Sequence, residues 1–115
     1  MAKRKNNKAA KSQGLAGFSD IQIRRVWEKA MEIPNENPVY WRKDKYGNVI
    51  SFRGYGNQNS KFGWQIDHSK PLSKGGTNHI NNLQPLFWKE NNLKGNKYPY
   101  KKTGKPLGKP EREDE

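Results

Sequence analysis

Residues 64–96 gather the side chains with which a protein could hydrolyse a phosphodiester bond. Asp67 and His68 are adjacent near the start of this stretch, and Asn91 lies close to its end. Such hydrolysis needs a metal that neutralises charge on the phosphoryl oxygens, a base that takes a proton from water, and a frame that holds both. Asp67 offers a carboxylate to the metal. Histidine is the side-chain type whose unperturbed pKa, about 6.5, suits a base near neutral pH. The stretch therefore predicts a metal-dependent nuclease site.

The available ligand atoms indicate which metal this site would hold. Asp67 and Asn91 supply two hard oxygen atoms, which leaves the rest of the coordination sphere to water and phosphate. Mg²⁺ keeps several waters and binds through few carboxylates, whereas Zn²⁺ prefers His and Cys. The chain contains no cysteine. We therefore expect one divalent metal ion, Mg²⁺, with Mn²⁺ as the alternative.

Because Asp67 and His68 are adjacent, they can share a site only with a particular backbone conformation. Neighbouring residues of a strand point to opposite faces, so the two side chains can serve one site only if the strand ends or bends there. Pro71 and the loop that begins at Ser69 are consistent with such an end. We expect Asn82 to pin this loop, because its amide can hydrogen-bond a backbone carbonyl near His68.

The spacing of these residues resembles the motif of the HNH endonuclease family, which folds as a ββα-metal finger. The matching positions are Asp67-His68, Pro71, Gly75-Gly76, Asn82-Leu83, Pro85-Leu86 and Asn91. The namesake positions fall on His68, Asn82 and Asn91, so the chain resembles an HNN variant. The resemblance implies that His68 is the general base, that Asp67 and Asn91 hold one divalent metal, and that Asn82 shapes the loop. It also implies products with a 5′-phosphate and a 3′-hydroxyl.

Many members of that family carry paired CxxC zinc knuckles, which this chain lacks. The finger must then be held by the N-terminal helix and by the apolar residues Trp64, Ile66, Leu83, Leu86 and Phe87. Each site residue also has an ordinary structural explanation. Asp67 and His68 could form a plain structural hydrogen bond, Asn82 could be a turn residue, and Asn91 could be an exposed helix residue.

The apolar pattern predicts the elements that position the site. They are a helix at 18–31, a hairpin made of 39–43 and 49–52 around a turn at 46–48, and the finger at 64–96. Ser19 and Gln22 form a capping box for the helix, whose apolar face places Trp27 in the core. Trp41 and Phe52 are expected in the core as well. The predicted fold class is α+β, a small domain with an N-terminal helix, a β-hairpin and a ββα-metal finger.

Length and composition set the limits of this domain. A chain of 115 residues points to one domain with tails, and an apolar content of 30% allows only a small core. We expect a disordered basic arm at 1–17, the nuclease domain at 18–98 and a flexible tail at 99–115. The acidic end of that tail is expected to be solvated, or alternatively to occupy the basic site when no DNA is bound.

The formal net charge of +12 favours a polyanionic partner. DNA is the expected partner, with RNA as the alternative, and no segment is apolar enough for a membrane span. The basic start lacks an apolar h-region, so we expect a cytoplasmic protein of a bacterial or phage-infected cell. The side chains expected to contact nucleic acid are Arg53, Lys61, Lys94 and His79.

The sequence therefore predicts a DNA endonuclease that nicks or cuts its substrate with weak sequence preference, because no recognition helix is evident. Two other functions stay open. One is a non-catalytic nucleic-acid-binding module, whose binding would survive the loss of His68. The other is a toxin nuclease of interbacterial competition, which uses the same chemistry.

Overall fold

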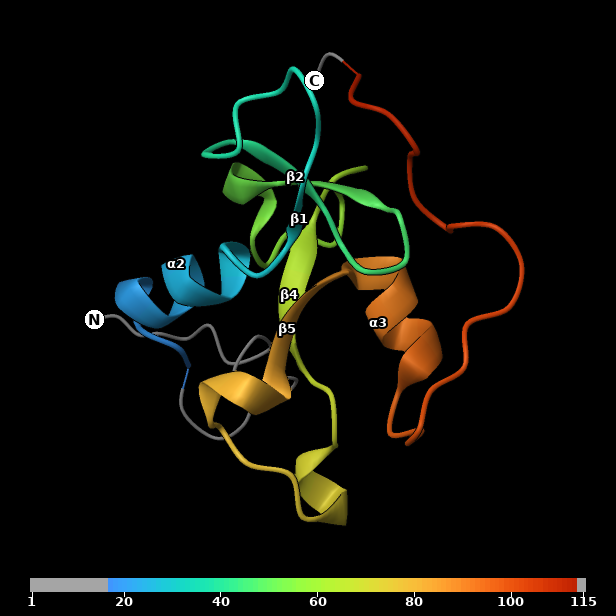
Figure 1. Cartoon of the computed structure of the whole chain (residues 1–115). Coiled ribbons are helices and arrows are strands. Elements are labelled where there is room, and N and C mark those ends of the chain that lie inside the picture. The colour runs from blue at the N-terminus through green and yellow to red at the C-terminus, as the bar shows by residue number, and fades with distance from the viewer. Residues whose placement is uncertain (1–16, 114–115) are drawn as a thin grey trace.

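The helix α2 (Asp20–Trp27) begins at the capping box that the sequence predicts. The Ser19 hydroxyl accepts a hydrogen bond from the Gln22 N–H at 3.1 Å, and the Gln22 side chain accepts one from the Ser19 N–H at 2.9 Å. Trp27 is fully buried, as expected. The computed structural model describes residues 17–113, which Figure 1 traces from α2 to the C-terminal segment.

The helix is shorter than predicted, because a strand replaces its last expected turn. The periodicity predicted a helix through Met31, but α2 ends earlier and Met31–Glu32 form β1. The guanidinium of Arg42 donates to the backbone carbonyls of Glu28 at 3.2 Å and Ala30 at 3.1 Å. The Arg42 side chain thus satisfies backbone carbonyls in the segment between α2 and β1.

The predicted hairpin forms the larger part of a three-stranded sheet. β1, β2 (Trp41–Lys43) and β3 (Val49–Ser51) pair antiparallel in that order. Asp44 organises the turn, because its carboxylate accepts hydrogen bonds from the N–H groups of Tyr46 and Asn48, both at 2.9 Å. Burial raises the pKa of Asp44, and hydrogen bonds to Asn48 and the backbone oppose that rise.

The finger consists of β4 (Trp64–His68), β5 (Leu83–Phe87) and α3 (Trp88–Lys94). The two strands pair antiparallel, with Asp67 opposite Gln84. Alternate residues of a strand face opposite sides. Ile66 belongs to the core that contains Trp27 of α2, whereas Gln65 and Asp67 bond side chains of α3. Figure 1 accordingly shows α2 and α3 on opposite sides of the β4–β5 ribbon.

The core lies between the ribbon, α2 and β3. Its buried residues are Val26, Trp27, Ala30, Ile50, Trp64, Ile66, Leu83 and Phe87. Leu86 is also buried, so every apolar residue predicted to hold the finger is inside the protein. Trp41 and Phe52, which were expected in the core, are only half-buried. Phe52 packs on Trp27 at 5.5 Å and Trp41 on Phe62 at 5.1 Å between ring centroids.

The C-terminal segment, predicted as a flexible tail at 99–115, contacts the hairpin over its described residues. The Lys109 carbonyl accepts a hydrogen bond from the Val49 N–H at 2.9 Å. The Gly108 N–H donates to Oδ1 of Asn48 at 2.7 Å. Figure 1 shows this segment passing α3 and running towards the three-stranded sheet. Backbone hydrogen bonds therefore tie the segment to β3 and its turn.

Some predictions concern the ends of the chain. The predicted basic arm, residues 1–17, lies outside the described residues except for Gly17, and so do residues 114–115 of the acidic end. Within the described range, none of the helices has the length and apolar character that crossing a membrane requires.

Candidate active site

Asp67 faces α3, and one side chain from β5 and one from α3 bind its carboxylate. Oδ2 accepts a hydrogen bond from Nε2 of Gln84 at 2.8 Å, and Oδ1 lies 3.3 Å from the ammonium of Lys94. The Asp67 and Lys94 side chains are only 6% and 2% exposed. Burial raises the pKa of Asp67, while the contacts with Gln84 and Lys94 oppose that rise. One amide and one cation therefore hold this buried carboxylate.

His68 lies on the opposite face of β4, on the side of α2. Its ring packs against Phe18, with 6.2 Å between the centroids. Its Nε2 lies 2.6 Å from Oδ1 of Asn78 in the loop between the strands. An amide oxygen only accepts hydrogen bonds, so this contact selects the tautomer with the proton on Nε2. The neutral ring then carries its lone pair on Nδ1.

The end of β4 explains how adjacent side chains on opposite faces can serve one site. The strand does not bend between Asp67 and His68, but it ends directly after His68, which is the other condition that the sequence required. Ser69 already belongs to the loop, and its N–H donates to the carbonyl of Asn82 at 2.8 Å. Both residues are buried, with 5% of Asp67 and 6% of His68 exposed.

Asn82 fixes the loop that follows His68. Its side-chain NH₂ donates to the carbonyls of Lys70 at 3.0 Å and Thr77 at 2.8 Å, and its Oδ1 accepts from the Lys70 N–H at 2.8 Å. A Cβ at Gly76 would lie 1.8 Å from the Lys70 carbonyl oxygen, so only glycine fits against this clamp. The predicted bond from the Asn82 amide to a carbonyl near His68 is present, with Lys70 as its acceptor. Together with the bond to Thr77, it ties two parts of the loop to Asn82.

Asn91 lies on α3 and faces the same side of the ribbon as Asp67. Its Nδ2 donates to Oε1 of Gln65 at 2.6 Å. Gln65 is two residues before Asp67 on β4 and therefore shares its face. The hydrogen bond directs the amide nitrogen towards β4 and leaves the amide oxygen available to a ligand. Within residues 17–113, no hydrogen bond joins Asn91 to Asp67 directly.

The donor set at this site suits a hard metal ion that brings its own water. Among residues 17–113, no group of three His, Cys, Asp or Glu side chains could hold a metal ion. Asp67 and Asn91 therefore offer one carboxylate and one amide oxygen, a set that Mg²⁺ accepts with several waters. The ammonium of Lys94 beside Asp67 shows that this position stabilises positive charge. A divalent metal held by these two oxygens would compete with Lys94 for Asp67.

A cavity of about 300 Å³ opens beside the end of the ribbon. Its walls include Ser69, which follows His68, and Gln84, which bonds Asp67. Lys29 and Lys45 also line the cavity. The ammonium of Lys29 donates to the carbonyls of Ile80 and Leu83, and burial lowers the pKa of Lys29. This cavity is a basic space lined by a neighbour of each candidate site residue, although neither Asp67 nor His68 lines it.

The four side chains expected to contact nucleic acid lie in different surroundings. Arg53 is exposed, with its guanidinium over the ring of Tyr40 at 5.7 Å. Lys61 is exposed and pairs with Glu113 at 3.1 Å. His79 is exposed, and its Nδ1 accepts from the Asn81 N–H at 3.1 Å, which is a turn contact. Lys94, by contrast, is buried within the site.

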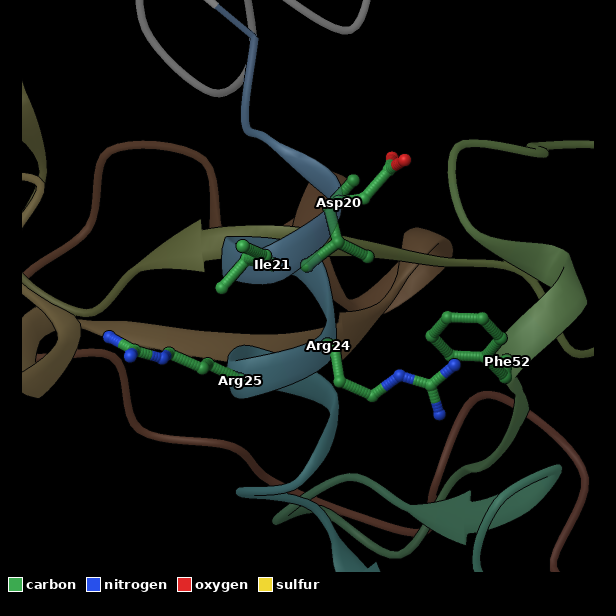
Figure 2. Close-up of a pocket in the computed structure, with 6 residues that line it drawn as sticks. Asp20, Ile21, Arg24, Arg25 and Phe52 are labelled. Atoms are coloured by element: carbon green, nitrogen blue, oxygen red, sulfur yellow. The ribbon is translucent and has the colours of Figure 1, made fainter.

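A wider cavity, of about 740 Å³, lies on the outer surface of α2. Figure 2 shows Arg24 reaching over the ring of Phe52 and Arg25 extending away from it. The Arg24 guanidinium carbon lies 4.2 Å from the Phe52 ring centroid. Ile21 in the same wall is 68% exposed. The surface of α2 is therefore basic and partly apolar.

Three residues that contact the site were not found from the sequence. Asn78 binds His68, Gln84 binds Asp67, and Gln65 binds Asn91. The two glutamines could have been found from the strand register, since Gln84 is opposite Asp67 and Gln65 shares its face. Asn78 gave no such signal, because an asparagine in a loop is an ordinary turn residue.

One comparison with known proteins gives a match, and it covers the finger. The family model described as HNH endonuclease matches residues 56–97, which include both strands and the helix of the finger. No curated protein and no solved structure gives a significant match. The matched segment also contains Asp67, His68, Asn82 and Asn91. Residues 56–97 of this chain are therefore similar to the HNH endonuclease family.

Proposed function

We propose that this protein is a metal-dependent DNA endonuclease. The observation that carries the proposal is the placement of Asp67 and His68 at the end of β4, inside the segment that matches the HNH family. The charge of +12 supplies attraction for the DNA backbone. Binding of this kind weakens steeply with salt, because each neutralised phosphate releases counterions.

His68 is the proposed general base. Its Nδ1 accepts a proton from the water whose oxygen attacks the phosphorus. The bond between phosphorus and the 3′ oxygen then breaks, and after protonation of that oxygen the products carry a 5′-phosphate and a 3′-hydroxyl. The bond from Nε2 to Asn78 holds the ring in the tautomer that leaves Nδ1 free to accept. Asn82 contributes by fixing the loop that carries Asn78.

Asp67 and Asn91 are the proposed ligands of one divalent metal ion, Mg²⁺ or Mn²⁺. When bound, such an ion neutralises charge on the phosphoryl oxygens and on the leaving oxygen. Lys94 holds the Asp67 carboxylate before the metal binds, and its second hydrogen bond, to the His68 carbonyl at 3.0 Å, offers the ammonium a place to remain afterwards. Lys94 is thus proposed to position both Asp67 and the end of β4, in place of the direct phosphate contact expected from the sequence.

A second candidate is a nucleic-acid-binding module without catalysis. The observation that favours it is that both oxygens of Asp67 already have a partner, because Gln84 binds one of them and Lys94 the other. In such a module Lys94 would permanently replace the metal. The two functions predict different metal binding, which is measurable without any substrate.

Metal binding should depend on Asp67 and Asn91 and not on their neighbour Asn92. We expect Asp67→Asn and Asn91→Ala to weaken Mn²⁺ or Mg²⁺ binding by at least the roughly 10- to 100-fold seen for residues that merely support a ligand. Asn92→Ala, an exposed amide on the same helix, is the matched control and should bind like wild type. Isothermal titration calorimetry measures all four proteins. Equal affinities in all four would remove these two residues from the metal site and favour the binding module.

A further inference from the structure

A second basic groove lies away from the end of the ribbon. It has a volume of about 340 Å³ and runs between the loop before β4, the first residues of α3 and the C-terminal segment. Three lysines from these three segments line it, namely Lys61, Lys89 and Lys109, together with the half-buried ring of Trp88. No acidic side chain is part of its lining.

Hydrogen bonds hold the walls of this groove in place. The indole N–H of Trp88 donates to the Ser60 carbonyl at 2.8 Å, which joins α3 to the loop. The Lys109 carbonyl accepts from the Val49 N–H at 2.9 Å, which joins the C-terminal segment to β3. The lysines are therefore presented from a fixed frame, although their side chains reach solvent.

One carboxylate of the chain already sits between two of these lysines. Oε1 of Glu113 lies 3.1 Å from the ammonium of Lys61, and Oε2 lies 3.4 Å from that of Lys109. The hydrogen bond from Lys61 lowers the pKa of Glu113, and Lys109 adds to this effect. Two oxygens of one anion thus bridge two cations from distant parts of the chain, as two oxygens of a backbone phosphate could.

We infer that this groove binds a phosphate of the DNA backbone away from the bond that is cut, and that Glu113 pairs with two of its lysines, Lys61 and Lys109, when DNA is absent. The inference rests on the proposed function, because DNA is the polyanion that the enzyme must hold. Trp88 and Lys89 begin the helix that carries Asn91. Three residues of helix rise about 4.5 Å, so a strand that reaches Asn91 has further phosphates close to the groove. Glu113 then acts as an internal competitor of DNA.

The test compares two acids of the same tail that differ in their contacts. Glu113→Gln and Glu111→Gln each remove one negative charge, but Glu111 is an exposed residue whose carboxylate forms no hydrogen bond or ion pair within residues 17–113. Affinity for a fluorescein-labelled DNA duplex is measured by anisotropy in EDTA, so that no cutting occurs. We expect Glu113→Gln to bind about threefold more tightly than Glu111→Gln, a ratio typical of one exposed ion pair.

The lysines provide the second arm of the test. Lys61→Gln should weaken binding and reduce the salt slope by about 0.9, the value for one lost phosphate contact on duplex DNA. Lys105→Gln, an exposed lysine of the same tail outside the groove, controls for the loss of charge. In the Lys61→Gln background, the advantage of Glu113→Gln over Glu111→Gln should disappear. Circular dichroism checks that each variant is folded.

Two results would overturn the inference. The first is equal affinity of Glu113→Gln and Glu111→Gln, which would leave only a general effect of charge. The second is an equal salt slope for Lys61→Gln and Lys105→Gln. These measurements need neither metal nor cleavage. A negative result for the groove would therefore not contradict the proposed nuclease activity. A failure of cleavage with an intact groove would point instead to the binding module.

Discussion

Replacing His68 by alanine is expected to slow DNA cleavage by about 10²- to 10⁴-fold, the range that general acid–base catalysis contributes. The imidazole is the proposed acceptor of the proton from the attacking water. Its Nε2 is engaged by Asn78, and Nδ1 keeps the lone pair. The measurement is the rate at which supercoiled plasmid becomes nicked or linear with Mg²⁺ present.

The second histidine of the chain is the matched control for this variant. His79 lies in the same loop region, is exposed, and makes a turn contact with the Asn81 N–H. His79→Ala should therefore keep the chemical step, with any loss confined to DNA binding. His68→Ala should still bind DNA, because the basic surface is untouched. If His68→Ala cut as fast as His79→Ala, His68 could not be the base.

The Lys94→Met variant is expected to lose about 3 kcal/mol of folding stability in the absence of metal. Methionine keeps most of the buried volume but leaves the Asp67 carboxylate without its cation, and breaking one side of a buried ion pair costs about 3–5 kcal/mol. The double variant Asp67→Asn/Lys94→Met should regain most of the lost folding stability, because neither position then carries a buried charge without a partner. Urea unfolding measures both, with exposed Lys97→Met as the control.

Two conditions should restore part of the folding stability that the Lys94→Met variant loses. Divalent metal should stabilise it more than wild type, because the ion would bind Asp67 without competition from the ammonium. Low pH should also reduce the loss of folding stability in this variant. The pKa of Asp67 is raised in the folded protein, so the folded state binds more protons and its stability falls as pH rises above the unfolded pKa. Loss of Lys94 raises that pKa further, so the difference from wild type should shrink as pH falls.

Stability of Lys94→Met equal to that of Lys97→Met would contradict this account. It would mean that the contact between Lys94 and Asp67 contributes little to folding. If the variant were stable and metal added no stability to it, Lys94 would have no role in the site. In both cases the position of Lys94 beside Asp67 would be a matter of packing alone.

Much of the fold could be predicted because its signals are local. The capping box of Ser19 and Gln22 lies within four consecutive residues, and the start of β4 alternates apolar and polar residues over Trp64, Gln65 and Ile66. The end of α2 could not be predicted in this way. Met31 continues the apolar period of the helix, but its pairing with β2 and the contacts of Arg42 with the nearby carbonyls depend on residues further along the chain.

The site shows the same division between local and distant contacts. The spacing of Asp67, His68 and Asn82 predicted a strand end followed by a pinned loop, and both are present. Lys94 lies three residues after Asn91, so its helix face could be inferred. The spacing did not reveal that β4 covers that face, which turns an expected phosphate contact into a buried partner of Asp67.

The C-terminal segment carried no pattern from which its contacts could be predicted. Tyr100 donates to Oε2 of Glu90 at 2.7 Å, and Lys102 pairs with the same carboxylate at 3.4 Å. Glu90 is completely buried, although a glutamate in a short polar helix is ordinarily exposed. Its burial depends on the segment that folds over it. These partners, ten and twelve residues after Glu90, are set by tertiary packing.

The conversion of supercoiled plasmid by the wild-type protein tests the central claim most directly. With Mg²⁺ or Mn²⁺ the protein should produce nicked and then linear DNA, and EDTA should stop the reaction. The same preparation should bind a DNA duplex with an affinity that falls steeply as salt increases. Cutting that needs the metal is the result that the account predicts. Tight, salt-sensitive binding with no cutting in either metal would contradict it and would identify a binding module.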